Sequence, residues 1–281
     1  MAVDKNLFLY DVAVGAIMKN EGHYIKEWID YHLLAGVDHF FIYDNESPDN
    51  QKEILQPYID AGIVTYKFFP NKNTQNLAYN DATRRFKFFC RYLTFIDGDE
   101  FILPKKCDTI SEIANTIFND KSNVGGFTIH WRTFGSNGHE KADYSKGVLD
   151  RFTRRAFDNH SLGKSGKYLT NPRKISYWDN PHFTKYFENF YLVDTNVAEE
   201  IILNHYVVKS KEEFVERKVR NGRVDVLGAP RDMKYFENHD LNDVFDDEIL
   251  RYRAARLDAF TKKWGGSTPS YSKRKLITRA F

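Results

Sequence analysis

VAVGAIMKNEGHYIKEWIDYHLLAGVDHFFIYD, residues 12–44, is the stretch that decides the fold. Its first seven residues form a continuous apolar run rich in β-branched side chains, which is typical of a buried strand. After KNEG, residues recur at helical spacing from Ile25 to Leu33, and Gly36 is placed to end that helix. HFFIYD, residues 39–44, predicts a second strand. This order favours two parallel strands joined by a helical crossover.

The alternation of strands and helices continues to residue 97. It predicts an α/β fold of the Rossmann-like kind, with a mostly parallel central sheet covered by helices on both faces. Beyond residue 110 the regularity weakens, although a capping box of Ser210 and Glu213 predicts a further helix start. The other expected elements are a helix starting at 47–49 and ending near Gly62, strands at 63–69, 92–97, 124–134, 173–178 and 200–208, and helices at 73–90, 211–220 and 243–263.

The length of 281 residues suits one large domain, or one domain with an appendage. Lys and Arg number 41 against 39 Asp and Glu, which gives no bulk electrostatic reason to expect nucleic acid as a partner. The two cysteines, Cys90 and Cys107, lack metal-site spacing and indicate a reducing compartment. The N-terminal residues do not resemble a signal peptide, and no apolar run reaches membrane-spanning length. A cytoplasmic protein is therefore expected.

FIDGDEF, residues 95–101, places three carboxylates in four residues between aromatic side chains. Such charges repel one another and are costly to desolvate, so a compensating cation is expected. Asp97 and Asp99 point to the same side of an extended segment, and Gly98 lets the backbone bend between them. Their hard oxygen ligands suit Mg²⁺ or Mn²⁺. A simple Asp-Gly-Asp turn without a ligand is the alternative.

This acidic segment follows the fourth predicted strand. Ligands of parallel α/β sheets bind at the carboxyl ends of the strands, where the predicted loops converge. These loops are residues 19–22, 44–49, 70–75 and 97–100. The position therefore favours a ligand site over a simple turn.

The order of these motifs resembles the nucleotide-sugar-dependent glycosyltransferases of the GT-A fold, and within them glycosyltransferase family 92 and its bacterial relatives. The shared pieces are KNE, an EW..YH helix, a G-V-x-H-F strand, a Y-D-N-x-S loop and D-x-D-E-F, which cover roughly the first hundred residues. WRTFGSNGH, RFTRR and an NHY..KS..EF..K pattern extend the resemblance, whereas the middle and the tail match weakly. The resemblance implies a GT-A fold, here followed by a C-terminal helical extension.

The resemblance also implies a transferase that uses a UDP-linked sugar, with UDP-galactose as one candidate, held through Mn²⁺ or Mg²⁺. Asp44 matches the acid that pairs with uracil in related GT-A enzymes. A late histidine is often the third metal ligand there; the candidates are His205 and then His182, and a structural role is the alternative for each. The implied metal ligands are Asp97, Asp99, His205 and His182, and the implied donor-binding residues are Lys19, Asn20, Glu21, Asp44, Asn45, Gln75, Asp97, Gly98, Lys218 and Arg223.

Inversion, which family 92 implies, needs a general base for the acceptor hydroxyl. The glycine-flanked loop FGSNGHEKAD carries three candidates, Glu140 first, with His139 and Asp143 beside it. An exposed polar loop without a catalytic role is the alternative. Trp131 and Trp178 could stack on sugar rings, although a core role is favoured for both.

The expected domains are a GT-A catalytic domain over 1–208, with a donor half to about residue 110 and an acceptor half after it, and a helical extension with a basic tail over 209–281. The tail suggests peripheral association with the inner membrane face and a glycan or lipid-linked glycan acceptor, as in surface polysaccharide or lipopolysaccharide synthesis. Rival interpretations are a nucleotidyltransferase, a nucleotide-sugar hydrolase and a non-catalytic carbohydrate-binding protein.

Overall fold

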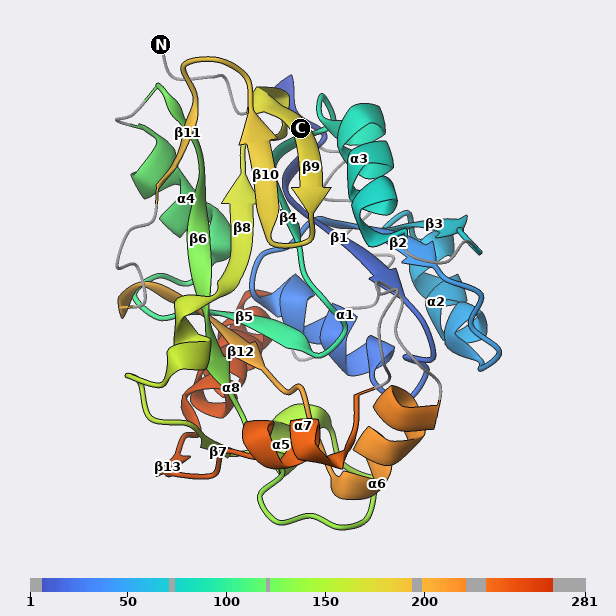
Figure 1. Ribbon diagram of the computed structural model, residues 1–281. Coiled ribbons are helices and arrows are strands. Elements are labelled where there is room, and N and C mark those ends of the chain that lie inside the picture. Colours follow the sequence, from blue (N-terminus) through green and yellow to red (C-terminus); the bar gives the residue numbers. More distant parts are fainter. Residues whose placement is uncertain (1–6, 71–73, 120–121, 194–198, 221–230, 265–281) are drawn as a thin grey trace.

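The computed structural model describes residues 7–70, 74–119, 122–193, 199–220 and 231–264, which form an α/β structure around a curled sheet (Figure 1). Within these residues, nine strands form one sheet in the order β3-β2-β1-β4-β8-β6-β12-β5, and β11 pairs with β6. These strands are β1 (Tyr10–Met18), β2 (His39–Asp44), β3 (Val64–Phe68), β4 (Cys90–Phe95), β5 (Glu100–Pro104), β6 (Val124–Thr133), β8 (Gly166–Thr170), β11 (Tyr191–Val193) and β12 (Ile201–His205).

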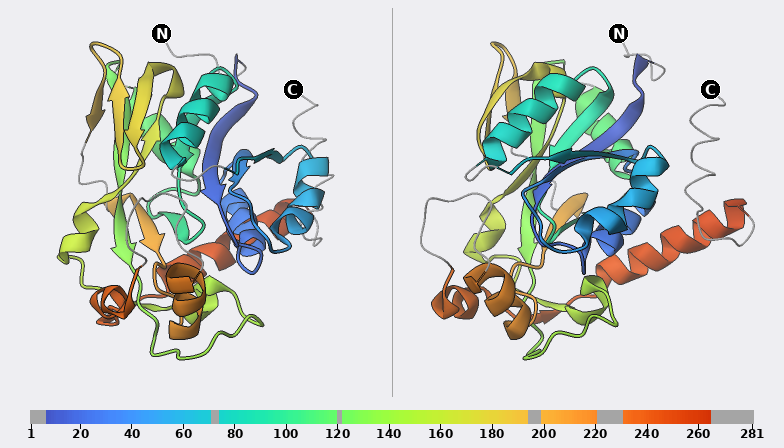
Figure 2. Two further views of the ribbon diagram at one scale, coloured as in Figure 1. Left: turned by 45° about the vertical axis from the view of Figure 1, so that its right-hand side comes forward. Right: turned by 90° about the vertical axis from the view of Figure 1, so that its right-hand side faces the viewer.

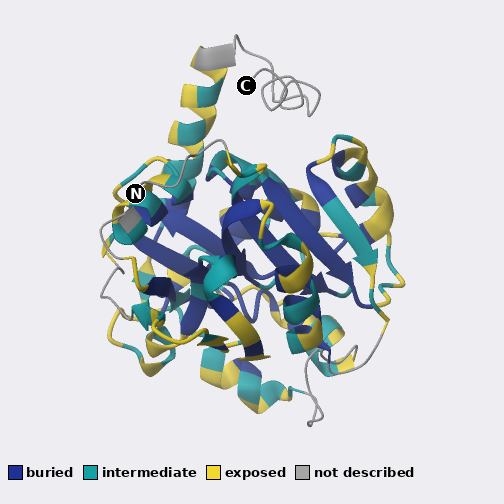
Figure 3. Ribbon diagram, turned by 90° about the horizontal axis from the view of Figure 1, so that it is seen from above, coloured by how far each residue is buried: buried dark blue, intermediate teal, exposed yellow. Residues whose placement is uncertain are grey.

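Most neighbouring strands of the sheet run parallel. β1 pairs in parallel with both β2 and β4, β2 with β3, and β6 with both β11 and β12, whereas β8 and β5 pair antiparallel with their neighbours. The prediction of an α/β fold with a mostly parallel central sheet is therefore confirmed. Figure 3 shows the buried strands enclosed by helices whose outer surfaces are exposed.

Helices cover both faces of the sheet. The helices before residue 120 are α1 (Ile25–Leu34), α2 (Gln51–Asp60), α3 (Gln75–Phe86) and α4 (Ile110–Asn119). α1, α2 and α4 pack on one face, where Trp28, Leu55 and Ile113 join the larger apolar core, and α3 packs on the other. Val12 and Val14 of β1 enter the first core while Ala13 and Ile17 enter the second, which explains the continuous apolar run of this strand.

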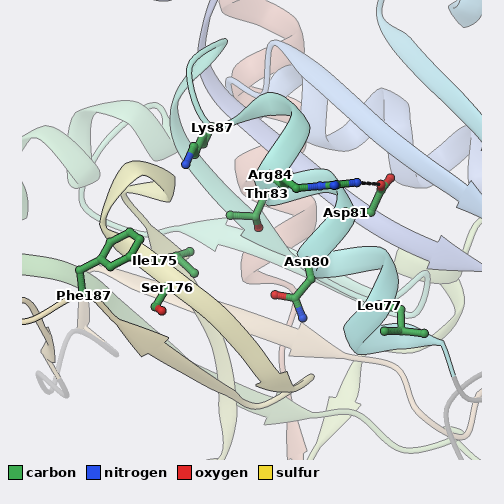
Figure 4. Close-up of a pocket in the computed structure, with 9 residues that line it drawn as sticks. All are labelled: Leu77, Asn80, Asp81, Thr83, Arg84, Lys87, Ile175, Ser176 and Phe187. Atoms are coloured by element: carbon green, nitrogen blue, oxygen red, sulfur yellow. Dashed lines mark hydrogen bonds and ion pairs between the residues drawn. The ribbon is translucent and has the colours of Figure 1, made fainter.

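The hairpin of β9 (Ile175–Asn180) and β10 (Phe183–Tyr186) lies against α3. A groove of about 390 Å³ runs between them, with Leu77 on the helix side and Phe187 on the hairpin side (Figure 4). Asn80 fixes the hairpin, because its amide group bonds both the N–H and the carbonyl oxygen of Trp178. The hairpin was not predicted, since only residues 173–178 carried a strand pattern.

Several predicted boundaries were wrong by a few residues. β4 ends at Phe95 rather than at residue 97, because the chain turns at Asp97, where Glu100 N–H donates to the Asp97 carbonyl. The first helical residue of α2 is Gln51, whose N–H donates to Asp49 Oδ1. Gly36 and Gly62 have positive φ angles of 92° and 70° and end their helices as predicted.

The capping box is confirmed, but the helix that follows it is not a regular α-helix. Ser210 caps α6 (Lys211–Phe214), and the chain continues as a π-helix over Val215–Arg220. The predicted terminal helix at 243–263 is also later than expected: α8 (Glu248–Trp264) starts after β13 (Val244–Phe245), which pairs with β7 (Arg154–Arg155).

The remaining helices are α5 (Val148–Arg151) and α7 (Met233–His239), with short 3₁₀ turns at Ser161–Lys164 and Pro172–Lys174. α8 extends away from the sheet (Figure 2). The described helices are all too short or too polar to cross a bilayer. The basic tail and Arg223 lie outside the described residues.

Candidate donor site

The acidic segment forms a tight loop between β4 and β5 at the carboxyl end of the parallel strands. Its backbone is held from both sides: Ile96 N–H donates to the Gly15 carbonyl of β1, and Tyr206 N–H donates to the Asp99 carbonyl. Glu100 closes the loop, because its carboxylate accepts from Asp97 N–H at 2.7 Å. The segment is thus a turn, as the alternative interpretation held, and it also gathers the predicted site residues.

The predicted donor residue Glu21 packs directly on this loop. A Cβ built on Gly98 would lie 2.8 Å from the carboxyl carbon of Glu21, so only glycine leaves room for that side chain. Glu21 is 7% exposed and pairs with Arg217 of the π-helix. The KNE and D-x-D motifs, which lie far apart in the sequence, therefore contact each other at Gly98.

Replacing Gly98 with alanine is expected to displace Glu21 and to lower the free energy of unfolding by about 1 kcal/mol, the low end of overpacking costs. Urea unfolding and UDP titration measure the two effects. Gly163→Ala is the matched control, since the nearest atom to its added Cβ is 3.4 Å away. Equal stability and equal UDP affinity of Gly98→Ala and the wild type would contradict the packing described above.

Both predicted metal-binding aspartates are paired with lysines. Asp97 accepts from Gln75 Nε2 at 2.9 Å and from Lys167 Nζ at 3.0 Å. Asp99 accepts from Lys218 Nζ at 2.9 Å, and its other oxygen lies 3.6 Å from His205 Nε2. The structure thus brings together the predicted residues Gln75, Asp97, Asp99, His205 and Lys218.

These ion pairs set the protonation of the site. Burial alone would raise the pKa of Asp99, but the Lys218 ammonium and the His205 imidazole outweigh it, so the pKa lies well below the usual range. Burial lowers the pKa of His205, which favours the neutral imidazole that can bind a metal. Burial raises the pKa of Glu100 to about 8. Burial would raise the pKa of Asp97 as well, but the Lys167 charge lowers it, so both aspartates are carboxylates at neutral pH.

Cationic side chains surround the acidic loop and Glu21. Besides Lys167 and Lys218, the site holds Arg217 and the buried Lys209. The Lys209 Nζ has no hydrogen-bond partner among the residues that the structure describes, and it lies 4.6 Å from the centre of the Tyr24 ring. Burial, followed by the nearby Arg217 charge, lowers the pKa of Lys209 to about 7. The site therefore combines acidic ligands with cations that suit a phosphate group.

The other donor candidates lie along the same rim. Asp44, 3% exposed at the end of β2, accepts from Tyr66 Oη at 2.5 Å and from Ser47 N–H at 3.0 Å. Asn45 donates to the Phe69 carbonyl. Asn20, next to Lys19 in the chain, has a positive φ of 59° and donates its N–H to Ser47 Oγ.

The second histidine candidate reaches the site from the β9–β10 hairpin. The ring centroid of His182 lies 5.3 Å from that of Trp131, and its Nδ1 is 3.4 Å from the Gly166 carbonyl oxygen. Trp131 has a polar role as well as a packing one, because its Nε1 donates to Glu100 at 2.6 Å and its ring lies 4.6 Å from His205. Trp178 is a core residue, as favoured.

The candidate bases lie on a surface loop over α5 and α6. Glu140 is exposed and pairs with Lys211 of α6 at 3.2 Å. Asp143 accepts from Ser145, and His139 Nε2 lies 3.2 Å from the Arg151 carbonyl oxygen of α5. Their role in catalysis stays a prediction.

The sequence did not single out Lys167, Glu100 or Arg217. Lys167 lies in β8, two residues before the core residue Leu169 of the same strand. Alternate residues of a strand share a face, so a lysine two residues before a core leucine is expected to point inward, but only once the strand is known. Glu100 was visible as the third carboxylate of FIDGDEF, but its contact with Trp131 bridges 31 residues of sequence.

Comparisons with known proteins agree with the motif order. The sequence profile of glycosyltransferase family 92 matches residues 14–247. A family 92 protein of Ricinus communis is 27% identical over 218 residues, which are 75% of this chain and 38% of that protein. The galactan beta-1,4-galactosyltransferase GALS2 of Arabidopsis thaliana is 30% identical over 99 residues, which are 32% of this chain and 19% of that protein. The matched part thus covers 38% of the first of these relatives and 19% of the second, less than half of either protein.

Among solved structures, residues 1–349 of S. aureus TarS in complex with UDP align with 90% of this chain and 72% of that chain. The TM-score is 0.43 and the identity 13%, a similarity too low to relate site residues between the two proteins. The family profile, in contrast, covers most of the chain and includes the whole acidic loop. The chain belongs to glycosyltransferase family 92.

Proposed function

We propose that this chain transfers a sugar from a UDP-sugar to a glycan acceptor, with the donor diphosphate bound at the loop of Asp97 and Asp99. The observation that carries this proposal is the convergence of both aspartates, His205 and cationic side chains at the carboxyl ends of parallel strands. The galactosyltransferase among the relatives supports galactose as one candidate sugar.

The ligand types at this loop fit Mn²⁺ or Mg²⁺. Two carboxylates and a neutral imidazole are ligands that such ions accept. Their present arrangement is not a closed ligand set: in the part of the chain that the structure describes, no three His, Cys, Asp or Glu side chains converge to hold a metal ion. Lysine ammonium groups take that place at both aspartates. A divalent ion, when bound, would neutralise charge that develops on the leaving diphosphate.

The protein side chains have distinct proposed roles around the donor. Asp44 would accept a hydrogen bond from the uracil ring. Asp97, Asp99 and His205 would hold the divalent cation, which would neutralise charge on the diphosphate. Lys209 and Arg217 place positive charge beside the leaving group, where it is most useful as the bond to the sugar breaks. Glu140 removes the proton of the acceptor hydroxyl in an inverting transfer.

The cellular setting is also a proposal. Synthesis of a surface polysaccharide or lipopolysaccharide at the cytoplasmic face of a membrane would suit a glycan or lipid-linked acceptor. The rival function that this donor site also fits is a nucleotide-sugar hydrolase, since such an enzyme binds the same diphosphate but transfers the sugar to water.

UDP release from a panel of UDP-sugars, measured with Mn²⁺ and with or without added glycans, tests the proposal. We expect release from one donor above all others, and an increase of about tenfold or more when a suitable glycan is present, since positioned reactants react faster than water. Release that no glycan increases would indicate the hydrolase. If the protein bound neither UDP nor any UDP-sugar of the panel, both the transferase and the hydrolase would be rejected.

A further inference from the structure

The two lysines that pair with the acidic loop differ in how firmly they are placed. Lys167 belongs to β8, its side chain is 1% exposed, and it also lies 3.9 Å from Glu100. Lys218 belongs to the π-helix, its side chain is 18% exposed, and Asp99 beneath it is 4% exposed. Lys167 is therefore a fixed counter-ion behind the loop, whereas Lys218 lies on the solvent side of Asp99.

The π-helix explains how Lys218 reaches Asp99. Two consecutive residues, Arg217 and Lys218, both turn inward, one to Glu21 and the other to Asp99. Glu216 and Arg220 face outward and pair with each other at 3.0 Å. π-helical turns are rare and recur at functional sites because their wider turn changes which side chains share a face.

Two nitrogen atoms of the site lack a hydrogen bond within the described residues. They are Lys209 Nζ and Arg217 Nε, and both are buried. An anionic group entering here would thus find Lys209, Arg217 and Lys218 on one side.

We propose that Lys218 is an exchangeable counter-ion: it pairs with Asp99 while no donor is bound and moves to a diphosphate oxygen when the donor enters with its divalent cation. This inference rests on the proposed function. Asp99 is released for the cation, and the ammonium keeps a charge-assisted hydrogen bond throughout. No covalent bond changes in this step.

The exchange has a thermodynamic consequence. A divalent ion binding alone must break the pair of Lys218 and Asp99 and leave the ammonium without a partner. When UDP is present, the ammonium gains a phosphate oxygen in return. The ion and UDP should therefore strengthen each other's binding by the same factor, because coupling between two ligands is reciprocal.

Lys218→Met separates this exchange from a structural role. Methionine removes the competing ammonium, so we expect Mn²⁺ alone to bind the variant about fivefold more tightly than the wild type. This factor corresponds to the free energy of a partly exposed ion pair. The phosphate contact is lost too, so UDP at saturating Mn²⁺ should bind about tenfold more weakly, the low end for a charged hydrogen bond. Isothermal titration of Mn²⁺, and of UDP with and without Mn²⁺, gives these constants.

Two further variants serve as controls. Lys211→Met removes the same charge from an exposed side chain of α6, and both affinities should stay within twofold of the wild type. Lys218→Arg keeps the cation and should restore most of the coupling between Mn²⁺ and UDP. Melting temperatures of all variants report whether each one folds.

The exchange predicts that Lys218→Met binds Mn²⁺ more tightly and UDP more weakly than the wild type. If Lys218→Met leaves Mn²⁺ binding unchanged or weakens it, the exchange is rejected, while UDP binding by the wild type still supports the proposed function. If the wild type binds UDP no better with Mn²⁺ than without it, the exchange is rejected as well. If the wild type binds neither probe, the proposed function fails and the exchange with it.

Discussion

Replacing Asp99 with asparagine is expected to lower kcat/KM for sugar transfer by about 10³-fold, which corresponds to about 4 kcal/mol of transition-state stabilisation. Asparagine has nearly the same shape but no charge, so it can neither hold a divalent cation well nor balance Lys218 and Lys209. The loop backbone should persist, because the Asp99 carbonyl still accepts from Tyr206 N–H. Initial rates with the donor and acceptor found by the UDP-release panel measure the loss.

The matched control for this substitution is Asp258→Asn on α8, where the carboxylate is exposed and pairs with Lys262 one turn further along the same helix. Its rate should stay within a factor of about two of the wild type. If Asp99→Asn retained more than a third of the wild-type kcat/KM, the carboxylate would not be needed for transfer, and the proposed role of the loop would be wrong.

Replacing Arg151 with methionine is expected to cost about 3–5 kcal/mol of unfolding free energy, because it breaks a buried ion pair and strands the remaining charge. Arg151 and Glu213 are 3% and 0% exposed at their side chains and are joined by two hydrogen bonds of 2.7 and 2.9 Å. Glu213 also accepts from Tyr24 Oη at 2.8 Å and from Ser210. Equilibrium urea unfolding measures the change.

The double variant Arg151→Met/Glu213→Leu identifies the cause of that loss. Removing both charges should recover at least about 2 kcal/mol relative to Arg151→Met alone, since an apolar pair leaves no stranded charge. No recovery would mean that packing by Arg151, or the lost hydrogen bonds of Glu213 to Tyr24 and Ser210, outweighs the stranded charge. Because the Glu213 carboxyl anchors the cap of α6, which precedes the π-helix, Arg151→Met should also weaken UDP binding, although it lies outside the donor site.

This pair also gives a pH signature in the wild type. Although burial opposes it, bonding to Arg151 and Ser210 lowers the pKa of Glu213 from 4.5 to about 2. The folded state therefore binds fewer protons than the unfolded state between these values. The stability that this group contributes is complete above pH 4.5 and is lost as the pH falls toward 2.

The N-terminal half of the fold was readable from the sequence because its strands are buried on both faces. Val12 and Ala13 point to opposite cores, so β1 shows as an unbroken apolar run, and β2 was predicted with its observed bounds. The second half mixes antiparallel strands from distant parts of the chain. β8 lies between β4 and β6. This strand order depends on pairing between distant segments, so it cannot be predicted from local periodicity.

The site was predictable where one motif supplies the chemistry. Asp97 and Asp99 are neighbours in the sequence, and strand order alone places them on the rim. Lys167 and Arg217 could not be found in this way, because each matters only through a partner 70 or more residues away. The π-helix was hidden as well, since its sequence has the periodicity of an ordinary charged helix.

A crystal structure of the protein with UDP and Mn²⁺ tests the central claim most directly. We expect the metal between the Asp97–Asp99 loop and the diphosphate, with Lys218 turned from Asp99 to a phosphate oxygen and the uracil beside Asp44. Nucleotide bound elsewhere, with Lys167 and Lys218 still paired to the two aspartates as they are here, would contradict the account.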